Sequence, residues 1–178
     1  MTKIAVFCSA AEGLPEKFKE AAQELGTWMG QNQKVLVYGG SYLGLMGVIA
    51  HAVRENGGQL YGFVPKRLTE NGWEEPNLDV TFPCENLCDR KDLMLLYSEA
   101  VIALPGGVGT LDELFTAMGQ NTMGESEKKI ILLNIDGFYN TLIQFMKELS
   151  GKGLLRHPLE HYMLVANTVE ELIPLLED

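Results

Sequence analysis

The sequence predicts an α/β fold in which one parallel β-sheet carries helices on both faces. Short apolar runs of strand length alternate with segments of helical periodicity along the whole chain of 178 residues. Glycine and proline separate most of these segments, and neither an internal repeat nor a low-complexity linker divides them. Because this alternation is typical of βαβ units, we expect residues 1–178 to form a single Rossmann-like domain.

The expected strands are short runs rich in Val, Ile, Leu, Phe or Tyr, bounded by turn residues. Most of these runs are apolar throughout, which is typical of strands that are buried on both faces of a parallel sheet. They cover residues 3–9, 34–40, 59–65, 79–83, 100–104, 129–134 and 161–167.

Helices are expected between the strands. Pro15 is placed to start the first of them. Asp89 is the expected cap of a helix over residues 90–98, and Thr168, with Glu171 three positions later, is the expected cap of the last helix. The other expected helices cover residues 45–56, 110–122 and 138–149, and residues 66–77 are expected to form a long polar loop.

The charge balance and the N-terminus exclude several classes of protein. The formal net charge is -10, from 14 basic and 24 acidic side chains, which argues against a nucleic-acid partner. The N-terminus lacks the pattern of a signal peptide, and no apolar run approaches the roughly 20 residues of a membrane span. We therefore expect a cytoplasmic protein with no membrane partner and with reduced thiols.

Two pairs of metal-binding residue types have the same spacing. Cys84 and Cys88 lie four positions apart, as do His157 and His161. A zinc site needs about four such ligands in complementary pairs, and Pro158 interrupts the histidine pair. The sequence therefore predicts no metal site.

Two expected strand-to-helix turns are rich in glycine. Glycine lets backbone N–H groups approach a ligand, and the helix that follows adds unpaired donors and the positive end of its dipole. Since ligands of such sheets lie beyond the carboxyl ends of the strands, the two turns predict a shared phosphate site. The alternative is that the glycines serve only tight turns or helix packing. They are Gly39, Gly40, Gly44 and Gly47 in YGGSYLGLMG, and Gly106, Gly107 and Gly109 in PGGVGT.

Neither turn matches a nucleoside triphosphate or dinucleotide motif. A P-loop needs Lys where Leu45 follows Gly44, and GxGxxG needs Gly where GVGTLD has Asp112. ATP and NAD(P) are therefore not the expected ligands, whereas a monophosphate group remains open.

Glu113 allows two interpretations. Residues 110–113 match T-x-x-E, a capping box in which Glu113 would accept a hydrogen bond from the N–H of Thr110. Glu113 also lies in the first expected turn of this helix, beside the candidate phosphate site, which makes it a catalytic candidate. It lies off the expected buried stripe, which consists of Leu111, Leu114, Phe115 and Met118.

Arg90 and Lys91 also allow two interpretations. Two cations in the first turn of a helix oppose its dipole, by roughly 0.3–1 kcal/mol each at exposed positions. An anionic ligand or a nearby carboxylate would relieve this opposition. The alternative is a solvated basic pair beside Asp89 and Asp92.

These residues carry a resemblance to a known family. DRKDLM (residues 89–94), followed after an expected strand by PGGVGTLDE (residues 105–113), resembles the paired RK and PGGxGTxxE motifs of the Lonely Guy (LOG) family. Members of this family are cytokinin riboside 5′-monophosphate phosphoribohydrolases, often labelled lysine decarboxylases. VYGGSYLGLMG and LLNIDGFYNTL resemble further stretches of the family, and the resemblance runs from residue 4 to residue 155 in the same order.

The resemblance implies hydrolysis of the N-glycosidic bond of a purine nucleoside 5′-monophosphate, cytokinin-type or AMP, to free base and ribose 5-phosphate. It implies Arg90 and Glu113 as the catalytic pair, because a carboxylate can stabilise the oxocarbenium-like transition state. It also implies a homodimer, and no metal or organic cofactor is required. The candidate substrate- and phosphate-binding residues are Gly40, Lys91, Gly106, Gly107, Gly109 and Thr110.

The chain departs from the family pattern around this machinery. The departures bear on the identity of the base and not on the phosphate or the ribose. Glu70 and Glu74, in the expected polar loop, are candidate substrate contacts by position alone, with solvated charges as the alternative. The departing positions are Ser9, Ser41, Leu87, Cys88, Gly119 and Gln120.

Two other functions compete with the phosphoribohydrolase. One is a carrier that binds a nucleotide or the molybdenum cofactor without turnover, since such Rossmann-like carriers use a similar glycine-rich turn. The presence of Arg90, Lys91 and Glu113 together favours the enzyme, because a carrier needs no carboxylate at the sugar. The other is a structural domain with ordinary capped turns, which would have no affinity for nucleotides.

Overall fold

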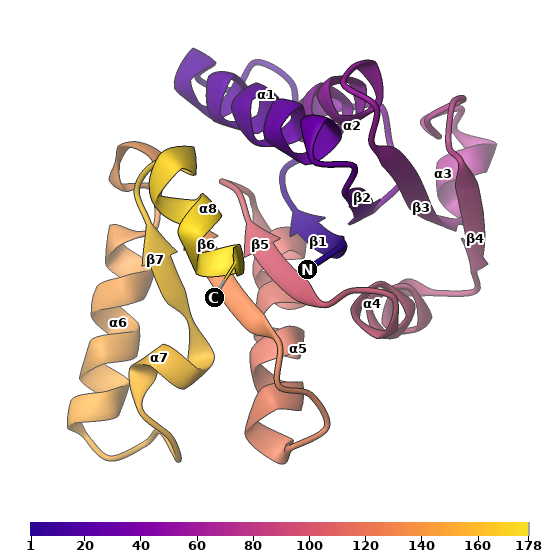
Figure 1. The fold of residues 1–178 in the computed structure, drawn as a ribbon. Coiled ribbons are helices and arrows are strands. Elements are labelled where there is room, and N and C mark those ends of the chain that lie inside the picture. The colour runs from indigo at the N-terminus through magenta and orange to yellow at the C-terminus, as the bar shows by residue number, and fades with distance from the viewer. Residues whose placement is uncertain (178) are drawn as a thin grey trace.

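A computed structural model, which describes residues 1–177, contains a seven-stranded sheet in which every neighbouring pair of strands is parallel (Figure 1). The strand order is β4-β3-β2-β1-β5-β6-β7. The predicted α/β fold is therefore confirmed. The strands are β1 (Lys3–Phe7), β2 (Val35–Tyr38), β3 (Gln59–Pro65), β4 (Val80–Cys84), β5 (Ala100–Ala103), β6 (Lys129–Leu133) and β7 (Leu164–Ala166).

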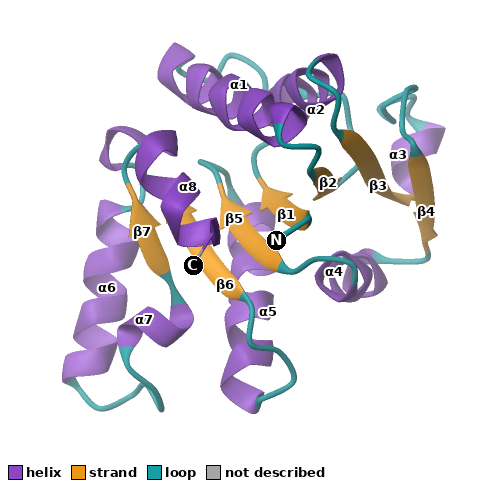
Figure 2. Ribbon diagram, viewed as in Figure 1, coloured by secondary structure: helices purple, strands orange, loops and turns teal. Residues whose placement is uncertain are grey.

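Helices cover both faces of the sheet, as Figure 2 shows by colour. α1, α2 and α8 pack on one face, and α4, α5, α6 and α7 on the other. The helices are α1 (Glu16–Gln31), α2 (Gly44–Glu55), α3 (Lys66–Glu70), α4 (Leu87–Leu96), α5 (Val108–Met123), α6 (Asn140–Gly151), α7 (Leu159–Tyr162) and α8 (Val169–Glu177), with a 3₁₀ turn η1 (Ile135–Gly137).

The two apolar cores explain the continuous apolar runs of the sequence. Successive side chains of a strand point to opposite faces, so a central strand contributes to both cores. In β1, Ile4 and Val6 belong to the core under α1 and α2, whereas Ala5 and Phe7 belong to the core over α5. All four are at most 1% exposed.

The sheet changes direction beside β1. The chain runs outward from β1 through β2 and β3 to β4, then returns to place β5 on the other side of β1. In sheets of this kind, ligands bind in the crevice at the carboxyl ends of the two strands that flank such a reversal. The PGGVGT turn directly follows β5, so the sequence motif lies at the position that the topology favours.

Four local predictions were wrong. Residues 66–70 form the short helix α3, so the polar segment is not entirely a loop. Asn86, and not Asp89, caps α4, because its side-chain oxygen accepts hydrogen bonds from the N–H groups of Cys88 and Asp89. α4 therefore begins at residue 87, three positions before the expected start. α5 begins at residue 108, two positions before its expected start.

The cap of α8 is close to the prediction. The N–H of Glu171 donates to Oγ1 of Thr168, as in a capping box. The carboxylate of Glu171, however, accepts from the N–H of Asn167 at 2.7 Å. The carboxylate of Glu171 therefore accepts from the residue before Thr168, and not from Thr168 itself as in a capping box.

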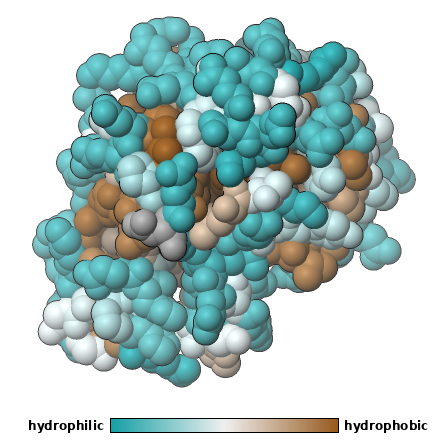
Figure 3. Space-filling model, viewed as in Figure 1, coloured by the Kyte–Doolittle hydropathy of each residue, from teal (hydrophilic) through white to brown (hydrophobic). Residues whose placement is uncertain are grey.

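The surface is mostly polar and is interrupted by apolar patches, one of which lies over α4 in Figure 3. Leu96, on this helix, is 75% exposed. Within residues 1–177, the structure has no helix long and apolar enough to cross a membrane.

Candidate active site

The turn between β5 and α5 ends in an open helix N-terminus. Gly107 precedes the first helical residue, Val108, and no side chain caps the helix. The N–H groups of a first helical turn have no acceptor within the helix, so they and the dipole are available to an anion. Val108 is 84% exposed, and a Cβ on Gly107 or Gly109 would meet open space. The turn therefore has room for a phosphate directly against backbone donors.

Thr110 helps to shape this turn from the inside. It is 3% exposed, and its side chain fills the space beside Gly106 that a Cβ would occupy. Any larger residue at Gly106 would push Thr110 away. Gly106 therefore permits the tight packing of the turn, whereas Gly107 and Gly109 face outward.

Glu113 lies in the second turn of α5 and is not part of a capping box. Because α5 begins at Val108, Thr110 is already inside the helix, and the structure shows no hydrogen bond between Glu113 and the N–H of Thr110. The side chain is half-buried. The pKa of the Glu113 carboxyl is raised to about 7, because the effect of burial, with a smaller one from Asp112, outweighs the lowering by Arg90 and Lys91. Such a carboxyl exchanges its proton near neutral pH, as a general acid or base requires.

Arg90 lies across the carboxyl ends of β2 and β3. Its Nε donates to the carbonyl oxygen of Phe63 at 2.9 Å, and its Nη2 donates to that of Gly39 at 2.7 Å. A Cβ on Gly39 would collide with this guanidinium. The first glycine-rich turn therefore makes room for the guanidinium of Arg90 and binds it. The charge of Arg90 lowers the pKa of Glu113. Among the described residues no ion pair joins Arg90 to Glu113, so each keeps capacity for a ligand.

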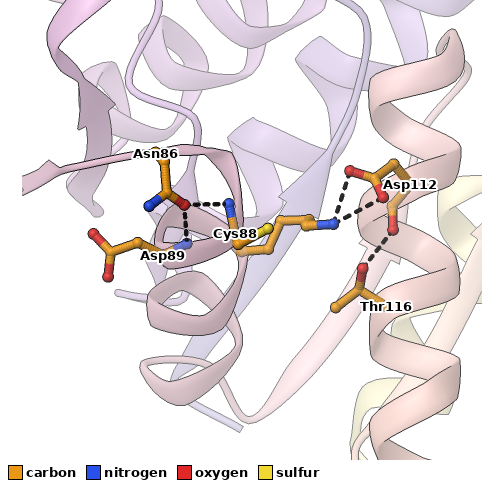
Figure 4. A network of polar contacts seen from close by, with 6 residues as sticks. Asn86, Cys88, Asp89, Asp112 and Thr116 are labelled. Carbon is orange, nitrogen blue, oxygen red and sulfur yellow. Dashed lines mark hydrogen bonds and ion pairs between the residues drawn. The ribbon is translucent and has the colours of Figure 1, made fainter.

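Lys91 joins the two helices that carry these residues. Its ammonium contacts both carboxylate oxygens of Asp112 at 2.8 Å, as the dashed lines in Figure 4 show. The side chain of Lys91 is only 15% exposed, whereas that of Asp112 is 53% exposed. α4 and α5 are therefore connected beside Arg90 and Glu113.

Arg90 and Lys91 do not lie in the first turn of α4, so the prediction that they oppose its dipole was wrong. With Asn86 as the cap and residue 87 as the first helical residue, both cations lie in the second turn of α4. The effect of the dipole falls off within the first turn. Their contacts with Gly39, Phe63 and Asp112 explain their positions instead.

Cys8 lies at the end of β1, behind the site. Burial raises the pKa of its thiol far above the usual range, and the negative charge of Glu113 adds to this effect, while Arg90 opposes it. The thiol therefore stays protonated. A protonated, buried thiol is a poor nucleophile, so Cys8 contributes packing and not covalent chemistry.

A buried polar network supports the glycine turn from the side of β6. The hydroxyl of Tyr139 donates to the carbonyl oxygen of Leu104 at 2.6 Å, directly before Pro105. Oδ1 of Asn134 accepts from the N–H of Tyr139, and its Nδ2 donates to Oδ1 of Asn140. The LLNIDGFYNTL stretch thus has a structural role that was not predictable from its residue types.

Ser41, a departure from the family pattern, connects the first glycine turn to the segment after α3. Its hydroxyl donates to the carbonyl oxygen of Trp73 and accepts from the N–H of Leu43. The N–H of Glu75 donates to the carbonyl oxygen of Gly40 at 2.8 Å. Ser41 is 1% exposed, and its hydroxyl both donates and accepts a hydrogen bond inside the protein, as a buried polar group requires.

The remaining candidates lie away from this arrangement. A Cβ on Gly40 would meet Val64, so the direction that its side chain would take is filled by protein. Glu70 lies near Lys66, and the carboxylate of Glu74 accepts from Thr69. Among residues 1–177 no three His, Cys, Asp or Glu side chains lie together in a way that could hold a metal ion.

Comparisons with known proteins agree with the motifs. The family model described as "Possible lysine decarboxylase" matches residues 46–176. The chain is 36% identical to cytokinin riboside 5′-monophosphate phosphoribohydrolase LOG1 of Arabidopsis thaliana, over 99% of this chain and 83% of that protein. It is 35% identical to the probable phosphoribohydrolase LOGL2 of Oryza sativa subsp. japonica, over 99% of this chain and 72% of that protein.

Solved structures share the fold at lower identity. The molybdenum cofactor binding protein of Rippkaea orientalis superposes with a TM-score of 0.75 at 24% identity, over 99% of this chain and 95% of that chain. The Moco carrier protein of Chlamydomonas reinhardtii superposes with a TM-score of 0.70 at 21% identity, with the same coverage. At such identities the likeness establishes the fold alone. Since the family model spans most of the chain and full-length relatives exceed 30% identity, the protein belongs to the Lonely Guy (LOG) family.

Proposed function

We propose that this protein hydrolyses the N-glycosidic bond of a purine nucleoside 5′-monophosphate, such as AMP or a cytokinin riboside monophosphate. The products are the free base and ribose 5-phosphate. The observation that carries the proposal is the position of Glu113, a half-buried carboxyl with a pKa of about 7, beside Arg90 and one turn beyond an uncapped helix N-terminus. The phosphoribohydrolase names of the relatives support the same reaction.

The 5′-phosphate binds at the start of α5. The backbone N–H groups around Gly107, Gly109 and Thr110 are the donors, and the open space above the two glycines admits the phosphate. Lys91, which contacts Asp112 of α5, adds positive charge near this turn. An ammonium has three N–H donors, so Lys91 can contact both oxygens of Asp112 and still donate to the phosphate.

Glu113 and Arg90 act at the ribose. As the glycosidic bond breaks, positive charge builds on the anomeric carbon, and the ionised carboxylate of Glu113 stabilises that charge and orients or deprotonates the attacking water. Arg90 favours the ionised form of Glu113, opposing the effect of burial. The backbone contacts of Arg90 hold its guanidinium in place before substrate binds.

The test is chromatography of AMP and isopentenyladenosine monophosphate after incubation with the pure protein and with Glu113→Gln. We expect the wild type to release free base, and the variant to be slower by at least about 100-fold, because the amide keeps the shape of the side chain but not its charge. The ratio of the two wild-type rates ranks the bases. Release of base at equal rates by both proteins would remove Glu113 from the mechanism.

The second candidate is a carrier, since molybdenum cofactor binding and carrier proteins share this fold. A carrier would bind a nucleotide or that cofactor and release it unchanged. Tight nucleotide binding with no free base, in wild type and variant alike, would replace the enzyme by this carrier.

We also propose that the protein is a homodimer whose interface adjoins the site. Phe115, expected in the buried stripe of α5, is instead 43% exposed, and Met123 on the same helix is 66% exposed. Leu96 on α4 adds a third exposed apolar side chain on the neighbouring helix. Light scattering coupled to gel filtration tests this proposal, and a monomeric mass at micromolar concentration would contradict it.

A further inference from the structure

Asp112 is the one residue of the PGGVGTLDE stretch whose side chain makes a charged contact with another element in the described chain. Both of its carboxylate oxygens lie 2.8 Å from Nζ of Lys91. Its backbone carbonyl oxygen also accepts from the hydroxyl of Thr116, one turn later on α5 (Figure 4). The sequence assigned no role to Asp112 beyond its mismatch with a dinucleotide motif.

The contact differs from an ordinary surface ion pair. Exposed pairs contribute little, because both side chains are solvated and mobile. Here the side chain of Lys91, on α4, is only 15% exposed and contacts Asp112 on α5. A largely buried ammonium needs a fixed acceptor, and Asp112 supplies two oxygens.

The pair lies directly beside the two proposed catalytic residues. Lys91 follows Arg90 on α4, and Glu113 follows Asp112 on α5. The contact between Lys91 and Asp112 therefore sets how α4 faces α5. A small displacement of either helix would change the placement of Arg90 relative to Glu113, and misplacement by about 1 Å can reduce a rate 100-fold.

We propose that Asp112 is a positioning residue, which binds Lys91 and so holds α4 against α5 with Arg90 and Glu113 facing the same substrate. The proposal rests on the proposed phosphoribohydrolase function. It assigns Asp112 no contact with substrate. It also predicts a change in the pKa of Glu113 when Asp112 is neutralised. The charged groups that act on Glu113 are Arg90 and Lys91 on α4 and Asp112 on α5. The thiol of Cys8, at the end of β1, also interacts with Glu113.

The sign of that effect follows from the charges. Neutralising Asp112 removes a negative charge that raises the pKa of Glu113 and releases a positive charge that lowers it. Both changes favour the ionised carboxylate. The pH at which activity rises should therefore move to lower pH in Asp112→Asn, by about one pH unit.

The experiment compares four proteins in kcat, in KM for AMP and in the pH profile of kcat/KM between roughly pH 5 and 9. They are the wild type, Asp112→Asn, Asp112→Glu and Asp92→Asn. Asp92 is exposed on α4, beside Lys91 in sequence, and has no ion pair within residues 1–177, so its variant matches the charge change without the contact.

We expect kcat of Asp112→Asn to fall about 10- to 100-fold with KM changed less, together with the shift of the pH profile. Asp112→Glu should recover part of the rate, because a carboxylate can again meet Lys91, and Asp92→Asn should match the wild type. A merely structural loss would lower the melting temperature without moving the pH profile.

The outcomes distinguish the positioning role of Asp112 from the proposed phosphoribohydrolase activity. An active wild type with Asp112→Asn equal to Asp92→Asn overturns the positioning role and leaves the phosphoribohydrolase intact. A rise in KM alone shows that Asp112 serves substrate binding, which also overturns the role proposed here. A wild type that releases no base from any nucleotide overturns both.

Discussion

The two glycine-rich turns of this protein look alike in sequence and differ in what surrounds them. In the β2–α2 turn, Cβ atoms on Gly39, Gly40 and Gly44 would meet Arg90, Val64 and the backbone of residues 9–11. In the β5–α5 turn, Cβ atoms on Gly107 and Gly109 would meet nothing within 4 Å. The first turn needs glycine to admit other parts of the protein, and the second leaves space for a ligand.

This difference assigns separate tasks to the two turns. The β2–α2 turn presents the carbonyl oxygen of Gly39 to Arg90 and is held from outside by Ser41 and Glu75. The β5–α5 turn presents unpaired N–H groups and the positive end of a 16-residue helix. One turn therefore orients a catalytic candidate, while the other has unpaired donors and open space for the proposed anion.

Gly39→Ala, in the β2–α2 turn, is the substitution with the largest expected effect. The added methyl group would displace the guanidinium of Arg90, so we expect kcat/KM for the nucleotide to fall at least about 100-fold. Overpacking should also lower the free energy of unfolding by about 1–3 kcal/mol.

The matched control is Gly151→Ala at the end of α6, where a Cβ would meet open space. Enzyme kinetics and denaturant unfolding of both variants check the prediction. Wild-type kinetics in Gly39→Ala would show that Arg90 does not depend on the β2–α2 turn for its position.

A second prediction concerns the cost of keeping Glu113 at the ligand turn. The pKa of its carboxyl rises from 4.5 to about 7 on folding, so the folded state binds the proton more tightly than the unfolded state. Stability from this group is present below pH 4.5 and is lost as pH rises to about 7. The shift corresponds to at most about 3 kcal/mol, and partial exposure reduces the expected loss to about 1–2 kcal/mol.

Glu113→Gln should therefore be more stable than the wild type at pH 8, and the difference should shrink as the pH falls through the interval from 7 to 4.5. Glu24→Gln, an exposed charge change on α1, is the control. Denaturant unfolding at several pH values measures both. A difference that is constant across this range would mean that Glu113 is not desolvated.

Much of the fold was predictable because it depends on local patterns. Apolar runs and turn residues located the strands, and their alternation with helices implied the parallel sheet. The helix starts were less predictable. Asn86 and Gly107 cap or precede α4 and α5, whereas Asp89 and Thr110 fit the capping pattern equally well in the sequence. Which polar residue caps a helix depends on where the strand before it ends.

The motifs select the candidate residues of the site, but they do not predict the contacts that these residues make. The motifs identified Arg90, Lys91 and Glu113, but the partners of Arg90 are the carbonyl oxygens of Gly39 and Phe63, which any residue type could supply. Backbone acceptors leave no signal in a sequence. The pairing of Lys91 with Asp112 spans 21 positions and depends on how two helices pack, which local patterns do not contain.

Gly107→Ala, in the β5–α5 turn, is the substitution with the smallest expected effect. The backbone of Gly107 has φ -91°, which alanine adopts, and the added methyl group would meet no other part of the protein. The free energy of unfolding should therefore change by less than about 0.5 kcal/mol. The methyl group would instead occupy space beside the donors of the phosphate site, so KM should rise about 10-fold, equivalent to about 1.4 kcal/mol of binding, with a smaller change in kcat. Inhibition by ribose 5-phosphate should weaken in parallel, because it carries the same phosphate. Loss of stability with unchanged KM would mean that Gly107 is needed for packing, like the glycines of the β2–α2 turn, and that the phosphate binds elsewhere.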